Sequence, residues 1–142
     1  MLFGQDRNQI RRVYFQSWDK FKRSQPMEPM ETLIAELIRL HPEYHDFFDD
    51  IEQNQEQDFT PEMGQTNPFL HLGMHIAIQE QISTQRPAEI VSLYQSLCHK
   101  TGDPHEAEHL IMDCLGEMLW QAQRNQQAPD EKAYLECVRK LL

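Results

Sequence analysis

The stretch Asn67–Ser83, NPFLHLGMHIAIQEQIS, decides the fold of this chain. Asn67 followed by proline has the order of a helix start, because an Asn side chain accepts hydrogen bonds from first-turn N–H groups and proline lacks an N–H that would have no partner there. The body of the segment, from Phe69 to Ile78, contains no formally charged residue. A helix that is apolar on most sides is buried. The sequence therefore predicts a central apolar helix near 67–83.

Helical spacing of apolar side chains continues on both sides of this segment, and prolines mark the joints. Six further helices are predicted, near 6–23, 29–40, 42–51, 87–101, 103–125 and 130–142. Asp6 with Gln9 resembles a capping box, as does Asp103 with Glu106. No alternating strand pattern competes with this interpretation. We expect an all-α, single-domain helical bundle of about six to seven helices over residues 1–142, a length typical of one domain.

One segment does not follow the helical pattern. Residues 52–66 are rich in Gln and acidic side chains and include Pro61 and Gly64. They predict a loop of about fifteen residues, which is long for a compact domain and is often functional or mobile.

The composition excludes several classes of protein. A formal net charge of −10 argues against nucleic acid as a partner, because phosphate backbones require a basic surface. The start of the chain has no signal-peptide core, and no later stretch reaches the roughly 18 apolar residues of a membrane span. Cys98, Cys114 and Cys137 are odd in number and lack CxxC spacing. We therefore expect an acidic cytoplasmic protein that does not associate with membranes, with reduced cysteines in its core.

The charges are unevenly distributed along the chain. Six Lys or Arg lie within the first 25 residues, whereas residues 40–85 contain nine Asp or Glu and no Lys or Arg. The simpler interpretation is that the basic first helix docks against the acidic span or faces solvent. The alternative is a region whose negative potential favours a bound cation.

Histidine spacing provides the most specific signal. If seven histidines were placed at random in 142 residues, about a third of one pair would be expected at the i,i+4 spacing that puts two side chains on one helix face. The chain has three such pairs, namely His41/His45, His71/His75 and His105/His109. Two imidazoles four residues apart lie about 6 Å apart on one helix face, where both can reach a metal such as Zn²⁺ or Fe²⁺.

The second pair lies on the most apolar helix. His71 and His75 share a face with Ile78 and Ile82, so we expect both to be buried if the isoleucines are. A buried imidazole needs a polar partner, because an unsatisfied buried polar group costs about 1–3 kcal/mol. A metal, a carboxylate, a backbone carbonyl or a water could each be that partner.

The third pair points away from the apolar stripe of its helix and lies beside a polar ridge that includes Glu106 and Glu117. Glu106 and His109 have the ExxH spacing of di-iron carboxylate bundles, although those bundles need two such motifs. The alternative is a solvated helix face. Glu80, the first charge after the apolar body, is expected to form a cap or salt bridge and is a weaker ligand candidate.

The first pair ranks last as a metal site. His41 precedes a proline and is expected to be a helix-boundary residue, and His45 a neighbour of Asp49. No GxSxG, Walker loop, HExxH or paired CxxC motif occurs, so no nucleotide cofactor is expected and no catalytic residue is assigned.

The segments QTNPFLHLGMHIAIQEQ at 65–81 and HEAEH at 105–109 resemble the bacterial domain of unknown function 1841 family. The resemblance extends from FGQDR at 3–7 through HPEYH at 41–45 to GE at 116–117 and WQAQ at 120–123. It implies no catalytic residues, since the family is named for having no assigned activity. A looser architectural similarity is to metal-binding four-helix bundles of the DinB kind, which take one histidine from one helix and an HxxxH pair from another. His71 or His75 would supply the first, and His105 with His109 the second.

Two functions remain open from the sequence. The first is a divalent-metal-binding bundle with Zn, Fe, Ni or Mn, in which the ligands are His71, His75, His105 and His109 and the auxiliary candidates are Glu106, Glu117 and Glu80. Hydrolysis through a metal-bound water is a possible activity of such a centre. The second is a non-enzymatic interaction or adaptor module that uses its charged surfaces to bind a protein partner or itself.

Overall fold

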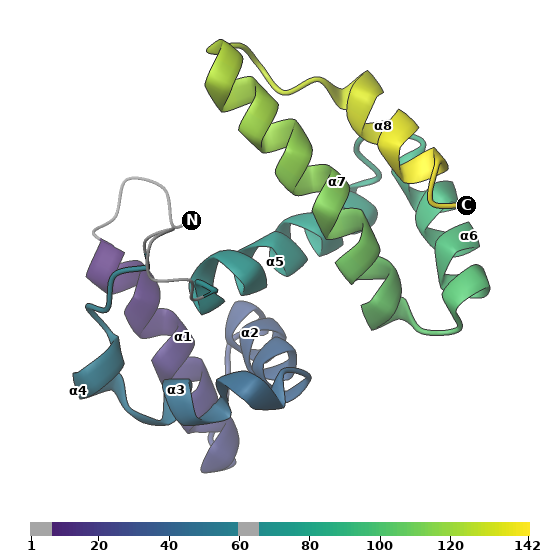
Figure 1. Ribbon diagram of the computed structural model, residues 1–142. Coiled ribbons are helices and arrows are strands. Elements are labelled where there is room, and N and C mark those ends of the chain that lie inside the picture. The colour runs from purple at the N-terminus through teal and green to yellow at the C-terminus, as the bar shows by residue number, and fades with distance from the viewer. Residues whose placement is uncertain (1–6, 60–65) are drawn as a thin grey trace. The chain divides into compact units, whose positions relative to one another are not determined.

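The structure is a computed structural model that describes residues 7–59 and 66–142. Within these ranges the chain forms helices and no strand, which confirms the all-α prediction (Figure 1). The α-helices are α1 (Arg7–Lys22), α2 (Pro29–Arg39), α3 (His45–Asp49), α4 (Ile51–Asn54), α5 (Pro68–Thr84), α6 (Ile90–Thr101), α7 (Pro104–Asn125) and α8 (Glu131–Arg139), and a 3-10 turn spans Pro42–Tyr44. None of the described helices combines the length and apolar character that a membrane span requires.

Helix α5 confirms the prediction made for 67–83. Asn67 Oδ1 accepts hydrogen bonds from the backbone N–H groups of Phe69 and Leu70 at 3.0 and 3.2 Å, so the predicted N-cap is present. Leu72 and Ile78 are fully buried. Leu70, in contrast, is 61% exposed, and Phe69, Met74 and Ile76 are only partly buried, so the segment is apolar also where it is not buried.

The chain divides into two compact units, Met1–Gly73 and Met74–Leu142. The boundary falls within α5, so residues 68–73 of this helix belong to the first unit and residues 74–84 to the second. The expectation of one domain over 1–142 stays a prediction.

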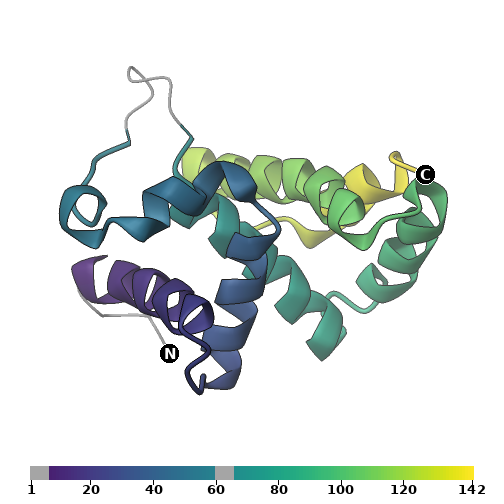
Figure 2. The same cartoon turned by 90° about the horizontal axis from the view of Figure 1, so that it is seen from below.

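The first unit is built on α1 and α2, which pack against each other (Figure 2). An aromatic cluster fills its interior, with Phe15, Phe48 and Phe69 in mutual ring contact at centroid distances of 5.3 to 5.9 Å. Arg11 is 6% exposed and donates to the carbonyls of Gln55 and Gln57 at 3.0 and 2.8 Å. This arginine therefore holds the segment after α4 against α1.

The basic side chains of α1 are largely engaged within this unit. Lys20 pairs with Glu31 at 2.8 Å, Lys22 with Asp49 at 2.6 Å and Arg7 with Asp58 at 3.1 Å. The interpretation that the basic helix docks against the acidic span of residues 40–85 is confirmed for Asp49 and Asp58, whereas Glu31 lies outside that span. The adaptor function, which relied on these charges as a binding surface, stays a prediction.

The second unit packs the end of α5 with α6, α7 and α8 around one apolar core. Its fully buried members include Ile78, Ile90, Ile111 and Val138. Helix α7 extends beyond this core, because from Leu119 to its end every side chain except that of Ala122 is exposed.

The predicted third helix is divided in the structure. A 3-10 turn and the short helices α3 and α4 replace the single helix expected over 42–51. The break falls at Asp50, whose backbone leaves the helical region and whose side chain accepts from Gln53 N at 3.1 Å to start α4. Helix α4 also occupies the beginning of the loop expected over 52–66, and residues 60–65 of that loop lie outside the described residues.

Two predicted helix starts also differ from the structure. Helix α6 begins at Ile90 rather than Pro87, because a turn closed by Ile90 N donating to Pro87 O precedes it. Asp103 caps α7 as predicted, but its N–H donates to Thr101 Oγ1 at 3.3 Å instead of to Glu106. The capping box expected at Asp6 lies outside the described residues.

The prediction of three reduced cysteines was wrong. Cys114 on α7 and Cys137 on α8 form a disulfide, and only Cys98 carries a free thiol among the described residues. Helices α7 and α8 bring the two Cα atoms to 5.7 Å, within the range that a disulfide spans. This distance depends on helix packing, which the spacing of cysteines along the chain does not reveal.

Candidate functional site

The first two turns of α7 carry one half of the candidate site. Asp103 Oδ1 accepts from His105 N at 3.1 Å, and Pro104 occupies the first helical position. This start fixes the register of α7, so that His105 and His109 lie on one face with their ring centroids 4.3 Å apart. Both side chains are half-buried.

Helix α5 supplies the other half through His75, whose side chain is 0% exposed. Its ring stacks on that of His105, with centroids 4.8 Å apart and planes inclined by 9°, and meets the His109 ring edge-on at 4.7 Å. Potential metal-ligand atoms of the three imidazoles lie within 4.8 Å of one another. Two helices of the second unit thus bring three histidines to one point.

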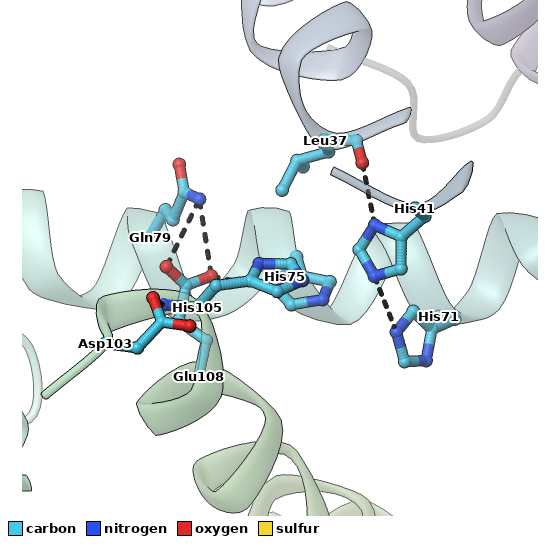
Figure 3. A network of polar contacts seen from close by, with 8 residues as sticks. All are labelled: Leu37, His41, His71, His75, Gln79, Asp103, His105 and Glu108. Atoms are coloured by element: carbon cyan, nitrogen blue, oxygen red, sulfur yellow. Dashed lines mark hydrogen bonds and ion pairs between the residues drawn. The ribbon is translucent and has the colours of Figure 1, made fainter. Parts of the chain in front are cut away.

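A buried carboxylate fixes the orientation of His75. Glu108 is only 6% exposed, and His75 Nδ1 donates to its Oε1 at 2.9 Å. Gln79 Nε2 donates to both oxygens of the same carboxylate at 3.3 and 3.4 Å (Figure 3). Since Nδ1 is the donor, neutral His75 carries its lone pair on Nε2, the nitrogen available to a metal.

Burial also affects the charge of His105. The pKa of His105 is lowered first by burial and then by His109 and His75, while Glu108 and Asp103 oppose the shift. A lowered pKa favours the neutral imidazole, which is the form that binds metals. His105 is therefore suited to act as a metal ligand.

His71, the other histidine of the α5 pair, belongs to the first unit. Its Nε2 lies 3.1 Å from Nε2 of His41, whose Nδ1 donates to Leu37 O at 2.7 Å (Figure 3). His41 does lie at a helix boundary, as expected, but it is only 1% exposed, and this burial was not predicted. His45 donates to Ile38 O at 3.0 Å. The pKa of Asp49 is lowered mainly by the hydrogen bond from Lys22, and the nearby His45 adds a smaller effect in the same direction.

The three auxiliary carboxylates lie elsewhere. Glu80, Glu106 and Glu117 are exposed, and Glu117 accepts from Gln121 Nε2 at 3.0 Å. Among the described residues none of the three belongs to the group of potential ligands around His75. The carboxylate that does reach this group, Glu108, was missed by the sequence reasoning.

A signal for Glu108 was present in the sequence. It begins a row on α7 that continues through Ile111, Met112 and Leu115, at the i+3, i+4 and i+7 positions of one helix face. All four side chains are buried. A carboxylate at the start of an apolar row needs a polar partner inside the protein. The His71/His75 pair on α5 offers such a partner.

Comparison with known proteins gives one match. A family model described as Domain of unknown function (DUF1841) matches residues 6–140. No curated protein and no solved structure matches the chain significantly.

Proposed function

Because the chain belongs to the DUF1841 family, whose description assigns no activity, we propose its function from the geometry: it binds a divalent metal ion through His75, His105 and His109. Imidazole nitrogens suit Zn²⁺, Fe²⁺ and Ni²⁺, and Mn²⁺ is bound more weakly by the same donors. The observation that carries the proposal is the convergence of three histidines from two helices, with potential ligand atoms within 4.8 Å of one another.

This separation is close to what shared coordination requires. Two nitrogens bound to one tetrahedral ion at about 2.1 Å lie about 3.4 Å apart. From a separation of at most 4.8 Å, each nitrogen would need to move by less than about 1 Å, which a change in side-chain torsion provides. An HxxxH pair on one helix and a third histidine from a second helix place donors on different sides of the ion.

The contact between Glu108 and His75 supports the same function. Histidine ligands of metals commonly donate their second ring nitrogen to a carboxylate, which fixes the tautomer and makes the metal-binding nitrogen more basic. His75 Nδ1 makes this contact, and Gln79 holds the carboxylate in turn. The negative charge of Glu108 would also offset part of the charge of a bound dication.

The reaction class to assay first is hydrolysis. Three histidines are the protein ligands of some zinc centres that activate water, because a further coordination position is then open to solvent or substrate. An ester or amide substrate series, tested with the metal-loaded protein and with the protein after chelation, would examine this part of the proposal.

Elemental analysis of untagged protein tests the binding function. We expect about one divalent ion per chain, because three converging imidazoles define one centre. The substitutions His75→Ala and His109→Ala should each abolish retention of the ion, whereas His99→Ala should not. His99 is the matched control, since it is exposed on α6 in the same unit. Metal-free protein whose melting temperature is the same with added Zn²⁺ and with a chelator would overturn the proposal.

A further inference from the structure

A cavity of about 360 Å³ lies in the second unit between the C-terminal half of α7, helix α8 and the connection between them. Cys114 and Cys137 both line it, together with Met118, Ala128 and Tyr134. The disulfide thus belongs to the wall of a cavity large enough for a small organic molecule.

The two cysteines differ in their access to solvent. Cys114 is 2% exposed and belongs to the buried core, whereas Cys137 is partly exposed. In thiol–disulfide exchange the attacking thiolate must reach one particular sulfur, and access decides which one. The structure therefore favours attack at Cys137, with Cys114 as the leaving group.

Helix α8 has contacts that do not depend on the disulfide. Tyr134 and Val138 are buried in the core, and Tyr134 Oη donates to Gln81 Oε1 at 2.7 Å. Arg139 pairs with Glu89. These contacts would keep α8 in place when the sulfur–sulfur bond is broken, so the unit can exist in both redox states.

We infer that Cys114–Cys137 is a reversible redox site at which a small thiol enters the cavity and exchanges with the disulfide. A thiolate attacks Cys137 Sγ and forms a mixed disulfide, while the electron pair of the broken bond goes to Cys114 Sγ, which takes up a proton. A second thiolate attacks the sulfur of the bound small molecule and releases Cys137 as a thiolate, which also takes up a proton. Two thiols become one small disulfide, and the protein gains a dithiol.

The charge of the cavity indicates which thiols it accepts. Glu117 and Asp130 line it, and none of the described residues that line it is Lys or Arg. A cationic thiol is therefore expected to react faster than an anionic one, since like charges repel at short range. This inference stands independently of the metal centre, because it uses neither the histidines nor Glu108.

The test measures the rate at which thiols reduce the disulfide in metal-free protein that carries the substitution Cys98→Ala. Samples are quenched with acid, their free thiols are alkylated, and the intact mass reports how many cysteines were reduced. The thiols are cysteamine, 2-mercaptoethanol and 3-mercaptopropionate, which are similar in size and are cationic, neutral and anionic, respectively. We expect rates that are first order in thiolate and that change little in urea concentrations below the unfolding transition. The rate per thiolate should fall in this order once it is divided by the rate of the same thiolate with a small neutral disulfide, because this ratio removes differences in intrinsic nucleophilicity. Cystamine should restore the disulfide.

Two results would overturn the inference. One is a rate that rises with urea in proportion to the unfolded fraction, which would mean that only unfolded chains react. The other is a rate that reaches the same plateau with all three thiols as their concentration increases, which would mean that unfolding limits the reaction.

Blocking the cavity gives a second readout. Ala128→Trp places a large side chain at the lining, and Ala88→Trp places one at an exposed position outside it. The first variant should slow reduction by cysteamine at least about fivefold, and the second should leave the rate unchanged within about twofold, since access controls exchange. Both variants should react equally fast in denaturing urea. Equal rates for the two folded variants would contradict access through the cavity.

Discussion

Glu108 Oε1 lies 2.9 Å from His75 Nδ1, and both side chains are withdrawn from solvent. A carboxylate that joins a buried histidine in this way acts on the opposite ring nitrogen, because it fixes the tautomer and increases the basicity of Nε2. If Nε2 binds a metal, the strength of that bond should depend on the charge of Glu108.

Glu108→Gln should therefore weaken metal binding by about 10- to 100-fold, the usual cost of losing such a partner. Competition with a chromophoric chelator measures the affinity. The matched control is Glu106→Gln, an exposed carboxamide substitution two residues away on the same helix. Equal metal affinities for the two variants would show that Glu108 does not support metal binding.

The stability of the metal-free protein should depend on His105 and pH. Its pKa lies below the ordinary value of 6.5, mainly through burial, so the unfolded chain binds more protons than the folded one as pH falls. The contribution of His105 to the free energy of unfolding is therefore present above pH 6.5 and is lost as the pH decreases toward the pKa of His105 in the folded protein. Urea unfolding with a chelator between pH 5 and 8 should show this loss, and His105→Gln should reduce it. An identical pH dependence in the variant would contradict the assigned cause.

The disulfide should contribute measurably to the stability of the second unit. Cys114 and Cys137 are separated by 23 positions, a loop whose closure is worth about 3 kcal/mol in the chain-entropy description. Replacement of both cysteines by alanine should lower the free energy of unfolding by about this amount, as measured in guanidinium. Reduced wild-type protein should behave like the variant. A loss found in the variant alone would instead indicate a packing defect.

Two adjacent arginines of α1 should respond very differently to substitution. Arg11 is buried, donates to two carbonyls and lies over the Phe69 ring at 4.5 Å, whereas Arg12 is exposed. Arg11→Lys should cost about 1–3 kcal/mol of stability, because lysine cannot reproduce both hydrogen bonds and the stacking. Arg12→Lys should change it by less than about 0.5 kcal/mol. Thermal and urea unfolding measure both, and similar losses would contradict the structural role of Arg11.

The same difference matters for the adaptor alternative. Charge reversal at Arg11 would disturb the fold of the first unit, so a partner lost in that variant would say little about binding. Arg12→Glu leaves the buried contacts of α1 intact and is the appropriate substitution for a co-purification experiment.

The features that the sequence predicted correctly are those that depend on residues close together along the chain. Asn67-Pro68 and the uncharged stretch after it determine α5, and Asp103-Pro104 determines the start of α7. Spacing of four placed His105 and His109 on one face, as observed. These features depend on residues within a few positions of one another.

The remaining features depend on packing between helices. The proximity of His75 to His105 follows from how α5 meets α7 within the second unit, and so does the pairing of Cys114 with Cys137 across α7 and α8. The break at Asp50 reflects a side chain that caps a new helix in preference to continuing the previous one. Glu108 was missed because a single charge in an apolar row is easily taken for a solvated position.

The length of α7 has a consequence for its motion. Its first turns carry His105 and His109 and are packed against α5, its middle is joined to α8, and its last turns leave the core. Those last turns rely on local contacts such as Arg124 over the Trp120 ring at 5.1 Å. Amide hydrogens should therefore exchange with solvent deuterium in a gradient along the helix, fastest near Asn125 and slowest around Ile111. The helix that holds the candidate centre rigid at one end would fray at the other.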